Sequence, residues 1–493
     1  QYSGGGWGTR DVCQGPLEYL LAIHRPESVR QMLLTVFSQQ NPDGDWPQWF
    51  MFFHRDRLIR PNDSHGDIVF WPLLATAQYL EASGDQSFLR EVVPFFAADP
   101  KAEETATVLE HMTRALHLIG SRLIPGTCLE AYGHGDWNDS LQPADPALRE
   151  HLCSSWTVTL HYQVLCTLAL ALGAVGESHL AGSLEAEAEE VLKDFRKHLL
   201  VDGIIPGYVN FEDAEEVVYL LHPLDHKTGL RYSLLPMIHA VINHMLTPDE
   251  ARQHFDLIEA HLKGPDGARL FDHPMVYRGG PMRIFQRAET ATYFGREIGL
   301  MYTHAHLRYA EALWQFGDAE AFFEALSKAI PIGIRDLVAS AAPRQTNCYY
   351  SSSDAVFRDR YQAYENYAQI KEGKVPLEGG WRVYSSGAGI ASGLIVRGLF
   401  GLRMTRLGII VDPVIPRELD GLRIEIDLGG HRFDVRYQRG ARGAGPQSLL
   451  LNGTPLRFER QENPYREGGV KVDLDLWREA LISGVNRLEI HLG

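Results

Sequence analysis

The chain has 493 residues, of which 45% are hydrophobic and 10% are aromatic, and this composition excludes an intrinsically disordered protein. Its formal net charge is −16, which argues against a general binder of nucleic acids or anionic membranes, because such proteins need basic patches. The sequence contains no run of about 18 apolar residues, so no membrane span is predicted.

Before residue 405, helical patterns alternate with long loops rich in Gly, Pro, Asp, His and Trp. Apolar residues recur on one face of 183–199, as in an outer helix, whereas 154–176 is apolar nearly all round, as in an inner helix. Such pairs of helices predict a helical toroid. The predicted helices are 16–39, 66–83, 103–119, 154–176, 183–199, 231–246, 249–262, 290–315, 318–330 and 387–402.

After residue 405, short runs alternate apolar with polar residues between Gly, Pro and Asn-Gly turns, for example LRIEIDLGG and HRFDVRYQRG. This period of two predicts strands joined by hairpins. We therefore predict a mainly helical domain over 1–405 and a small antiparallel β domain over 406–493.

The cysteines at positions 13, 128, 153, 166 and 348 are odd in number and include no C-x-x-C pair. This pattern disfavours a disulfide framework and a structural zinc site. A reducing, cytoplasmic location is therefore predicted.

The first of the loops that could carry chemistry is QYSGGGWGTRDVCQGP, at 1–16. Its glycines would let the backbone approach a ligand, and Arg10 with Asp11 could bind hydroxyl groups. The spacing does not match a P-loop. The alternative is a glycine turn followed by a surface ion pair.

The second loop, 41–71, crowds aromatic residues such as Trp46 and Trp49 among Asp45, His65 and Asp67. Aromatic faces and carboxylates together are typical of carbohydrate subsites, because sugar rings stack and sugar hydroxyls form hydrogen bonds. The same residues would also make an ordinary aromatic core.

The third loop, YGHGDWNDSLQP at 132–143, places Asp136, Trp137, Asn138 and Asp139 in succession. A carboxylic acid beside an indole face can have its pKa raised by desolvation, which suits a general acid, and the indole offers a platform for a sugar ring. The alternative is a helix N-cap.

The segment 285–312 carries Glu297, His304 and His306 on or near one helix. Glu297 and His304 are two helical turns apart and would share a face. The pattern is not HExxH and no third ligand is apparent, so zinc is disfavoured. The alternative is a structural histidine with satisfied hydrogen bonds.

The last loop, WRVYSSGAGIASG at 381–393, places Ser385, Ser386 and Gly387 directly before a helix of small residues. Serine hydroxyls, a glycine N–H and a helix N-terminus favour an anion such as phosphate. The alternative is a plain serine N-cap.

Together these loops resemble the inverting β-glycoside phosphorylases of glycoside hydrolase family 94, most specifically through GDWND and then through SGGGWGTRD and REIGLMYTHAH. The resemblance implies a mainly α fold, with an (α/α)6 barrel as catalytic domain and a small β-sandwich-like domain after it. In the family a β-sandwich and a helical linker precede the barrel. We therefore expect Gln1 to lie inside a domain, with the barrel incomplete at its N-terminus.

The resemblance also implies roles for individual residues. It identifies Asp139 as the general acid and Trp137 as a residue that lines the glucosyl subsite. It implies that Arg10 and Asp11 bind the hydroxyls of that sugar and that Glu297 lies in the substrate site. It assigns phosphate contacts to His304, Ser386 and Gly387, where Ser386 replaces a family threonine. A further phosphate-binding arginine of the family would fall before Gln1.

Cellobiose phosphorylases of the family typically continue the first motif as RDQLQD, whereas this chain reads RDVCQG, with Gly15 in place of the last aspartate. This departure, together with YFGREIGLMYTHAHLRYAEA, looks most like the 1,2-β-oligoglucan phosphorylases. The resemblance implies reversible phosphorolysis of β-1,2-linked gluco-oligosaccharides (sophoro-oligosaccharides) to α-D-glucose 1-phosphate and a shortened chain. The alternatives are a cellobiose- or cellobionate-type phosphorylase, an inverting hydrolase with Glu297 or Asp67 activating water, and a non-catalytic glycan-binding protein.

The partners implied are a β-gluco-oligosaccharide and inorganic phosphate, which is a co-substrate. No metal and no other cofactor is expected, and neither is a nucleic acid or a membrane. A homodimer is left open.

Overall fold

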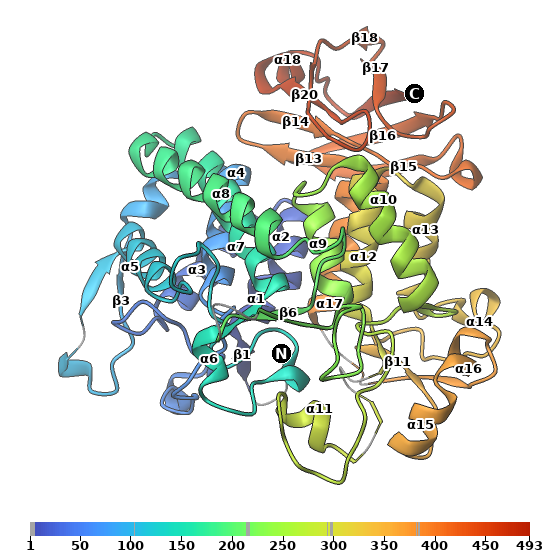
Figure 1. Cartoon of the computed structure of the whole chain (residues 1–493). Helices are drawn as coiled ribbons and strands as arrows, with labels where there is room; N and C mark the ends of the chain where they lie inside the picture. Colours follow the sequence, from blue (N-terminus) through green and yellow to red (C-terminus); the bar gives the residue numbers. More distant parts are fainter. Residues whose placement is uncertain are drawn as a thin grey trace.

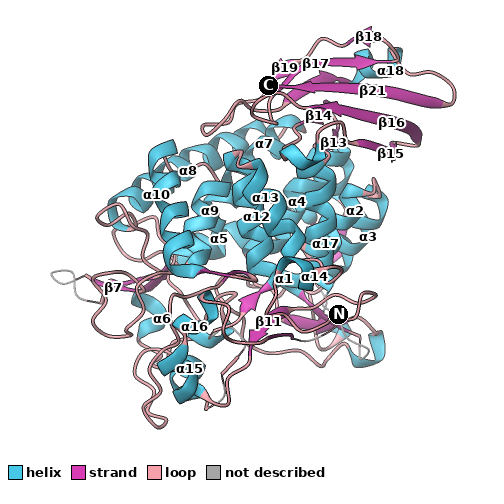
Figure 2. Cartoon of the chain, turned by 90° about the vertical axis from the view of Figure 1, so that its right-hand side faces the viewer, coloured by secondary structure: helices cyan, strands magenta, loops and turns pink. Residues whose placement is uncertain are grey.

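The computed structural model describes residues 5–102, 104–212, 217–292, 294–295, 299–380, 382 and 385–493. Long helices occupy the middle of the molecule, the C-terminal sheets lie at one end, and long loops with short strands lie at the other (Figure 2). Figure 1 shows the same order, with the C-terminal strands in orange and red above the helices. The prediction of a mainly helical protein with a C-terminal sheet region is confirmed.

Within the described residues, the inner layer is a closed series of helices, in which each helix contacts the next and the last contacts the first. The helix α9 is buried along its whole length, as its apolar sequence requires. In chain order the inner helices are α2 (Gly15–Ala22), α4 (Phe70–Ser83), α7 (Ser155–Ala174), α9 (Leu234–Ile242), α12 (Thr303–Phe316) and α17 (Ser385–Leu394).

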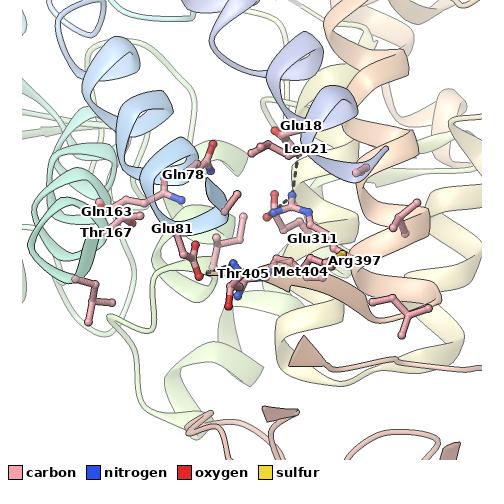
Figure 3. A pocket seen from close by; sticks show the side chains of 18 of the residues that line it. Glu18, Leu21, Gln78, Glu81, Gln163, Thr167, Glu311, Arg397, Met404 and Thr405 are labelled. Atoms are coloured by element: carbon pink, nitrogen blue, oxygen red, sulfur yellow. Dashed lines mark hydrogen bonds and ion pairs between the residues drawn. The ribbon is translucent and has the colours of Figure 1, made fainter. Parts of the chain in front are cut away.

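The inner helices all run in the same direction. Residues near their C-terminal ends line one cavity of about 570 Å³, part of which Figure 3 shows. These residues include Leu21, Gln78, Thr167, Ile242, Gln315 and Gly393. The N-terminal ends therefore meet at the loop end of the molecule. Because the first backbone N–H groups of each helix have no partner inside the helix, that end carries partial positive charge.

A second set of helices covers the inner layer and follows it alternately along the chain. These outer helices are amphipathic, and α5 and α10 each begin with a capping box, Thr107 with Glu110 and Thr247 with Glu250. They are α3 (Pro26–Phe37), α5 (Val108–Ser121), α8 (Ser178–His198), α10 (Pro248–Leu257) and α13 (Ala319–Lys328).

Two predicted helices differ from the structure. The predicted helix 16–39 is two helices, because Pro26 cannot continue the hydrogen bonding of α2 and instead starts α3. The predicted helix 290–315 begins as α12 only at Thr303, and Met301 and Tyr302 before it form a short strand.

By length and composition alone, α7 is the one described helix that is apolar enough to cross a membrane, with a mean hydropathy of 1.4. This finding corrects the expectation that no such stretch exists. However, 61% of the window that meets this criterion is buried inside the protein. The helix packs against α4, α8 and α9. Its apolar surface is therefore used in the helical core, as predicted for 154–176.

Short elements support the loops at the N-terminal ends of the inner helices. The short helices of this end are α1 (Thr9–Val12), α6 (Leu148–His151), α11 (Gln286–Thr290), α14 (Ile334–Leu337), α15 (Arg360–Asn366) and α16 (Ala368–Lys371). The short strands of the helical region are β1 (Gly6–Gly8), β2 (Trp49–Met51), β3 (Val92–Pro94), β4 (Thr105–Thr107), β5 (Leu152–Ser154), β6 (Tyr208–Asn210), β7 (Val218–Leu220), β8 (Lys263–Gly264), β9 (Gly267–Ala268), β10 (Met301–Tyr302), β11 (Ser352–Ala355) and β12 (Leu377–Gly379).

The C-terminal region contains two sheets in the orders β13-β14-β20-β19 and β15-β16-β21-β17-β18. Alternate residues of β21 are buried, which follows the predicted period of two. The pairing of β16 with β21 is parallel, in contrast to the all-antiparallel prediction. Because a long crossover that includes α18 (Leu474–Glu479) precedes β21, this last strand can enter beside β16 in the same direction.

The strands of these sheets are β13 (Leu402–Thr405), β14 (Gly408–Val411), β15 (Arg423–Leu428), β16 (His431–Gln438), β17 (Pro446–Leu451), β18 (Thr454–Pro455), β19 (Glu459–Arg460), β20 (Val470–Asp473) and β21 (Val485–Leu492). The sheets are joined to the helices by polar contacts. The Tyr437 hydroxyl donates to the backbone carbonyl of Phe400 at 2.7 Å, and the Trp314 indole donates to the carbonyl of Asp412 at 3.3 Å.

Candidate functional site

The loop 132–143 is anchored by Asp136, which is buried. One carboxylate oxygen of Asp136 accepts a hydrogen bond from the backbone N–H of Asn138 at 2.8 Å, and the other accepts from the Ser154 hydroxyl at 2.7 Å. Ser154 is the N-cap residue of α7, so this contact ties the loop to the start of an inner helix. Burial raises the pKa of Asp136, against the opposing effect of these hydrogen bonds. The first aspartate of GDWND therefore holds the loop in place.

His65 holds the same loop from the side of α4. Its Nδ1 lies 2.9 Å from the backbone carbonyl of Asp136 and 3.3 Å from Nη2 of Arg10, and the shorter of these contacts, to a group that only accepts, assigns the proton to Nδ1. The other ring nitrogen accepts from the side-chain amide of Gln142 at 2.8 Å. Burial and the nearby Arg10 lower the pKa of His65 to about 4, so this histidine is neutral at pH 7.

Arg10 lies in α1 and reaches the start of α4, where its Nε is 3.3 Å from Oδ2 of Asp67. The same carboxylate oxygen accepts from the Trp71 indole at 2.9 Å. The Arg10 and Asp67 side chains are 8% and 0% exposed, so the alternative of a surface ion pair is wrong. Burial lowers the pKa of Arg10, but the carboxylates of Asp67 and Asp139 outweigh it and raise the pKa. Arg10 is therefore a buried cation that faces the loop 132–143.

Trp137 joins this loop to the start of α12. Its ring packs edge to face against Tyr302, with centroids 4.8 Å apart, and against His304, with centroids 5.2 Å apart. Edge-to-face contacts of this kind favour a fixed ring orientation. Two segments that the sequence separates by more than 160 residues therefore form one aromatic cluster.

Asp139 is the carboxylate of the loop that a ligand can reach. Its side chain is 29% exposed, whereas Asp136 is 2% exposed. One carboxylate oxygen of Asp139 lies 3.7 Å from Nδ1 of His65. The structure thus separates the two aspartates of GDWND into a buried anchor and an accessible acid.

His304 lies in the first turn of α12 and is 3% exposed. Its Nε2 is 2.8 Å from Oε1 of Gln14, a residue 290 positions earlier in the chain. Burial, Arg308 and Arg10 together lower the pKa of His304 well below its ordinary value. His304 is therefore neutral at pH 7.

The start of α17 packs on α1 and α2. The Ser386 hydroxyl, buried at 0% exposure, donates to the backbone carbonyl of Asp11 at 3.3 Å and lies 3.4 Å from an oxygen of its carboxylate. Gly387 faces the ring of Tyr349, which a larger side chain would overlap. A side chain on Gly15 would overlap the backbone of Ser386, so the glycine permits the close approach of the two helices.

The structure brings most of the predicted site residues to the N-terminal ends of the inner helices, namely Arg10, Asp11, Trp137, Asp139, His304, Ser386 and Gly387. Glu297 lies outside the described residues. Arg10, the hydroxyl of Ser386 and the ring of His304 are each engaged by protein groups.

The sequence motifs predicted no role for Gln14 or His65, and they suggested Asp67 only as the base of the hydrolase alternative. The sequence signal that could have identified these residues was their position inside loops already selected by composition. Their partners are far along the chain, and spacing does not reveal such contacts.

His306 belongs to the opposite face of α12. Its Nδ1 accepts from the backbone N–H of Ala268 at 3.1 Å, and its Nε2 donates to the carbonyl of Ala325 at 2.8 Å. The two histidines of HxH therefore do not converge, and His306 has the satisfied structural role proposed as the alternative. Over the described part of the chain, no cluster of His, Cys, Asp and Glu could hold a metal ion.

Comparison with protein families gives two matches. A family model described as the catalytic domain of the glycosyl hydrolase 94 superfamily matches residues 2–349, and a model described as a glycoside phosphorylase C-terminal domain matches residues 401–491. The two matched ranges correspond to the helical region and the C-terminal sheets.

Three relatives are similar to this protein over most of the chain. A 1,2-beta-oligoglucan phosphorylase of Listeria innocua serovar 6a is 43% identical over 474 residues, which is 95% of this chain and 42% of the relative. A cellobionic acid phosphorylase of Neurospora crassa is 24% identical over 84% of this chain and 49% of the relative. The cyclic beta-(1,2)-glucan synthase NdvB of Rhizobium meliloti is 24% identical over 91% of this chain and 15% of the relative. The chain thus spans less than half the length of each of these relatives.

Proposed function

The chain belongs to the glycosyl hydrolase 94 superfamily, and on this premise we propose that it is the catalytic part of an inverting glycoside phosphorylase. The proposed substrates are β-1,2-linked gluco-oligosaccharides and inorganic phosphate, and the products are α-D-glucose 1-phosphate and a shortened chain. The linkage is taken from the Listeria innocua relative and from the motif that ends at Gly15. The inner and outer helices are proposed to form an (α/α)6 barrel over 1–405, followed by a β domain over 406–493.

The observation that carries the proposal is the contact between Trp137 and His304. It joins the loop of the accessible carboxylate, Asp139, to the helix start where a phosphate contact is expected. An acid and an anion site on either side of one sugar are what a single displacement requires.

In the proposed reaction, Asp139 protonates the glycosidic oxygen while a phosphate oxygen attacks the anomeric carbon from the opposite face. The bond to the leaving sugar breaks as the bond to phosphate forms, and the configuration at the anomeric carbon is inverted. In reverse, Asp139 acts as the base and the chain is extended from the sugar phosphate. Phosphate is the nucleophile and a co-substrate, so no other cofactor is proposed.

Several groups support an anion beside the sugar. The first turns of α12 and α17 carry backbone N–H groups that have no partner within their own helix, and such groups favour negative charge. We propose that His304, Ser386 and the Gly387 N–H contact the phosphate, and that Arg10, Asp11, Trp137 and Glu297 bind the sugar.

The alternative of an inverting hydrolase requires a second carboxylate to activate water. Asp67 is not suited to that role, because it is 0% exposed and is already bound by Arg10 and Trp71. Asp136 is equally engaged by Ser154 and Asn138. Of the two carboxylates that the hydrolase alternative requires to activate water, Asp67 is therefore disfavoured and Glu297 lies outside the described residues.

The test uses the intact protein that contains this chain, incubated with β-1,2-, β-1,3- and β-1,4-linked gluco-oligosaccharides with and without phosphate. We expect α-glucose 1-phosphate only when phosphate and the β-1,2-linked substrate are both present. Equal cleavage in phosphate-free buffer would reject a phosphorylase in favour of the hydrolase. A preference for β-1,4 linkages would reject the proposed substrate, and binding without any cleavage would favour the glycan-binding alternative.

A further inference from the structure

Below the candidate site, a chain of buried polar contacts leads from His304 into the middle of the inner helices. Oε1 of Gln14 lies 2.8 Å from Nε2 of His304 and 3.4 Å from Nη2 of Arg308. The amide nitrogen of Gln14 donates to the backbone carbonyl of Arg10 at 3.2 Å. Gln14 therefore contacts both the expected phosphate ligand, His304, and the backbone of the expected sugar ligand, Arg10.

The partners of Gln14 determine which way its amide points. A guanidinium only donates, so the atom of Gln14 that faces Arg308 is the oxygen, and a carbonyl only accepts, so the atom that faces Arg10 is the nitrogen. The same oxygen faces Nε2 of His304, which must then carry the proton. In the neutral ring, Nδ1 is left with a lone pair. Within the described part of the chain this buried nitrogen has no hydrogen-bond partner.

Arg308 is itself held by a closed ring of alternating charges, of which Figure 3 shows Glu18, Glu311 and Arg397. It contacts Glu18 at 2.5 Å and Glu311 at 2.6 Å, and Arg397 contacts the same two glutamates at 3.0 and 2.7 Å. The Glu18, Arg308 and Glu311 side chains are less than 10% exposed. Each charge has two partners of opposite sign, so the ring compensates the cost of burying its members.

The ring joins the three helices whose starts form the candidate anion site. Glu18 lies one turn after Gln14 on α2, Arg308 lies one turn after His304 on α12, and Arg397 lies in the π-helical turn that continues α17. The ring therefore ties α2 and α12, one turn after Gln14 and His304, to the π-helical turn at the far end of α17.

We propose that Gln14 is a positioning residue, which holds the ring of His304 so that Nδ1 is the nitrogen presented to the phosphate. The identity of that ligand rests on the function proposed above. A neutral His304 accepts a hydrogen bond at Nδ1 from a protonated oxygen of phosphate. The low pKa of His304, set by burial and by Arg308, Arg10 and His239, agrees with this form.

The experiment compares two replacements of Gln14 in the intact protein. Gln14→Met removes the acceptor for His304 and Arg308, and we expect the KM for phosphate to rise about tenfold or more, while the KM for the oligosaccharide changes less than about threefold. Gln14→Glu keeps the acceptor, and we expect it to retain phosphate binding. Its carboxylate also stabilises protonated His304, so a new ionisation is expected between pH 5 and 8 in the KM for phosphate.

The matched control is Gln40→Met. Gln40 is also fully buried and its amide oxygen contacts a buried histidine, His111, but far from the site. This variant is expected to lose thermal stability without a change in the KM for phosphate. If Gln14→Met and Gln40→Met behave alike, or if Gln14→Met leaves the KM for phosphate unchanged, the positioning role is rejected.

Calorimetric titration with inorganic phosphate separates this inference from the proposed reaction. If the wild-type protein binds phosphate but forms no sugar phosphate, the proposed reaction fails, and weaker phosphate binding by Gln14→Met still supports the positioning role. If the wild-type protein does not bind phosphate, both fail.

Discussion

At the N-terminal ends of the inner helices, the buried polar groups include one ion pair, Arg10 with Asp67, beside neutral histidines, an amide and the carboxylate of Asp136, which accepts hydrogen bonds from Ser154 and Asn138. One turn or more further along the same helices, the buried groups are ions with two partners each, as in the ring of Glu18, Arg308, Glu311 and Arg397. Beyond the ring lies the cavity against β13. The loop end, which must admit a ligand, is thus supported by a layer of helices whose buried charges are all paired.

The largest difference between the two ends is expected in catalysis. Asp139→Asn at the loop end removes the proposed general acid, and kcat is expected to fall about 10³-fold, because a positioned acid contributes that order of acceleration. Glu81→Gln, which changes a carboxylate of the cavity end, is expected to leave kcat unchanged. Phosphorolysis rates of both variants test the comparison. An Asp139→Asn protein with wild-type turnover contradicts the assignment of the acid.

The next difference concerns the stability of the ion pairs. Arg308→Met leaves two buried glutamates with one cation, which is expected to cost about 3–5 kcal/mol in the free energy of unfolding. For a chain of 493 residues the thermal midpoint is then expected to fall by roughly 3–5 °C. The control is Arg403→Met, which breaks the more exposed pair with Glu81, and there the expected loss is under about 1 kcal/mol. Equal midpoints of the two variants would show that the ring does not stabilise the inner helices.

The smallest difference concerns pH. The pKa of His65 is lowered to about 4 by burial and Arg10, so the unfolded chain binds a proton more readily than the folded protein. Stability from His65 is therefore present above pH 6.5 and is lost as the pH falls towards 4, by about 2 kcal/mol between pH 7 and pH 5. His65→Gln keeps a donor and an acceptor, and its thermal midpoint is expected to depend less on pH in this range.

The ring should respond in a different pH window. The pKa of Glu311 is lowered to about 2, where burial, which raises it, is outweighed by Arg397 and Arg308. Its contribution is present above pH 4.5 and is lost only as the pH falls towards 2. Glu311→Gln is therefore expected to leave the difference between the midpoints at pH 7 and pH 5 unchanged. A reduced difference in this variant would contradict the separation of the two ends.

Much of the fold could be predicted from periodicity. The textures of 154–176 and 183–199 predicted an inner and an outer helix, and α7 and α8 have those positions. The split of 16–39 at Pro26 could have been predicted from the same sequence, because proline starts helices and does not continue them. The parallel pairing of β16 and β21 could not, because a strand's own pattern is the same in either direction.

In the candidate site, local motifs identified the loops, and the tertiary structure showed how the side chains within each loop are placed. The sequence by itself determined the family, the two textures and the presence of Asp136, Trp137 and Asp139 in one loop. Only the tertiary structure, in which helix starts far apart in the chain meet, decided which aspartate is the anchor and why Arg10 is buried. It also decided which nitrogen of His304 has no hydrogen-bond partner among the described residues. Such contacts depend on the directions and positions of whole helices, and residue spacing within one segment carries no information about them.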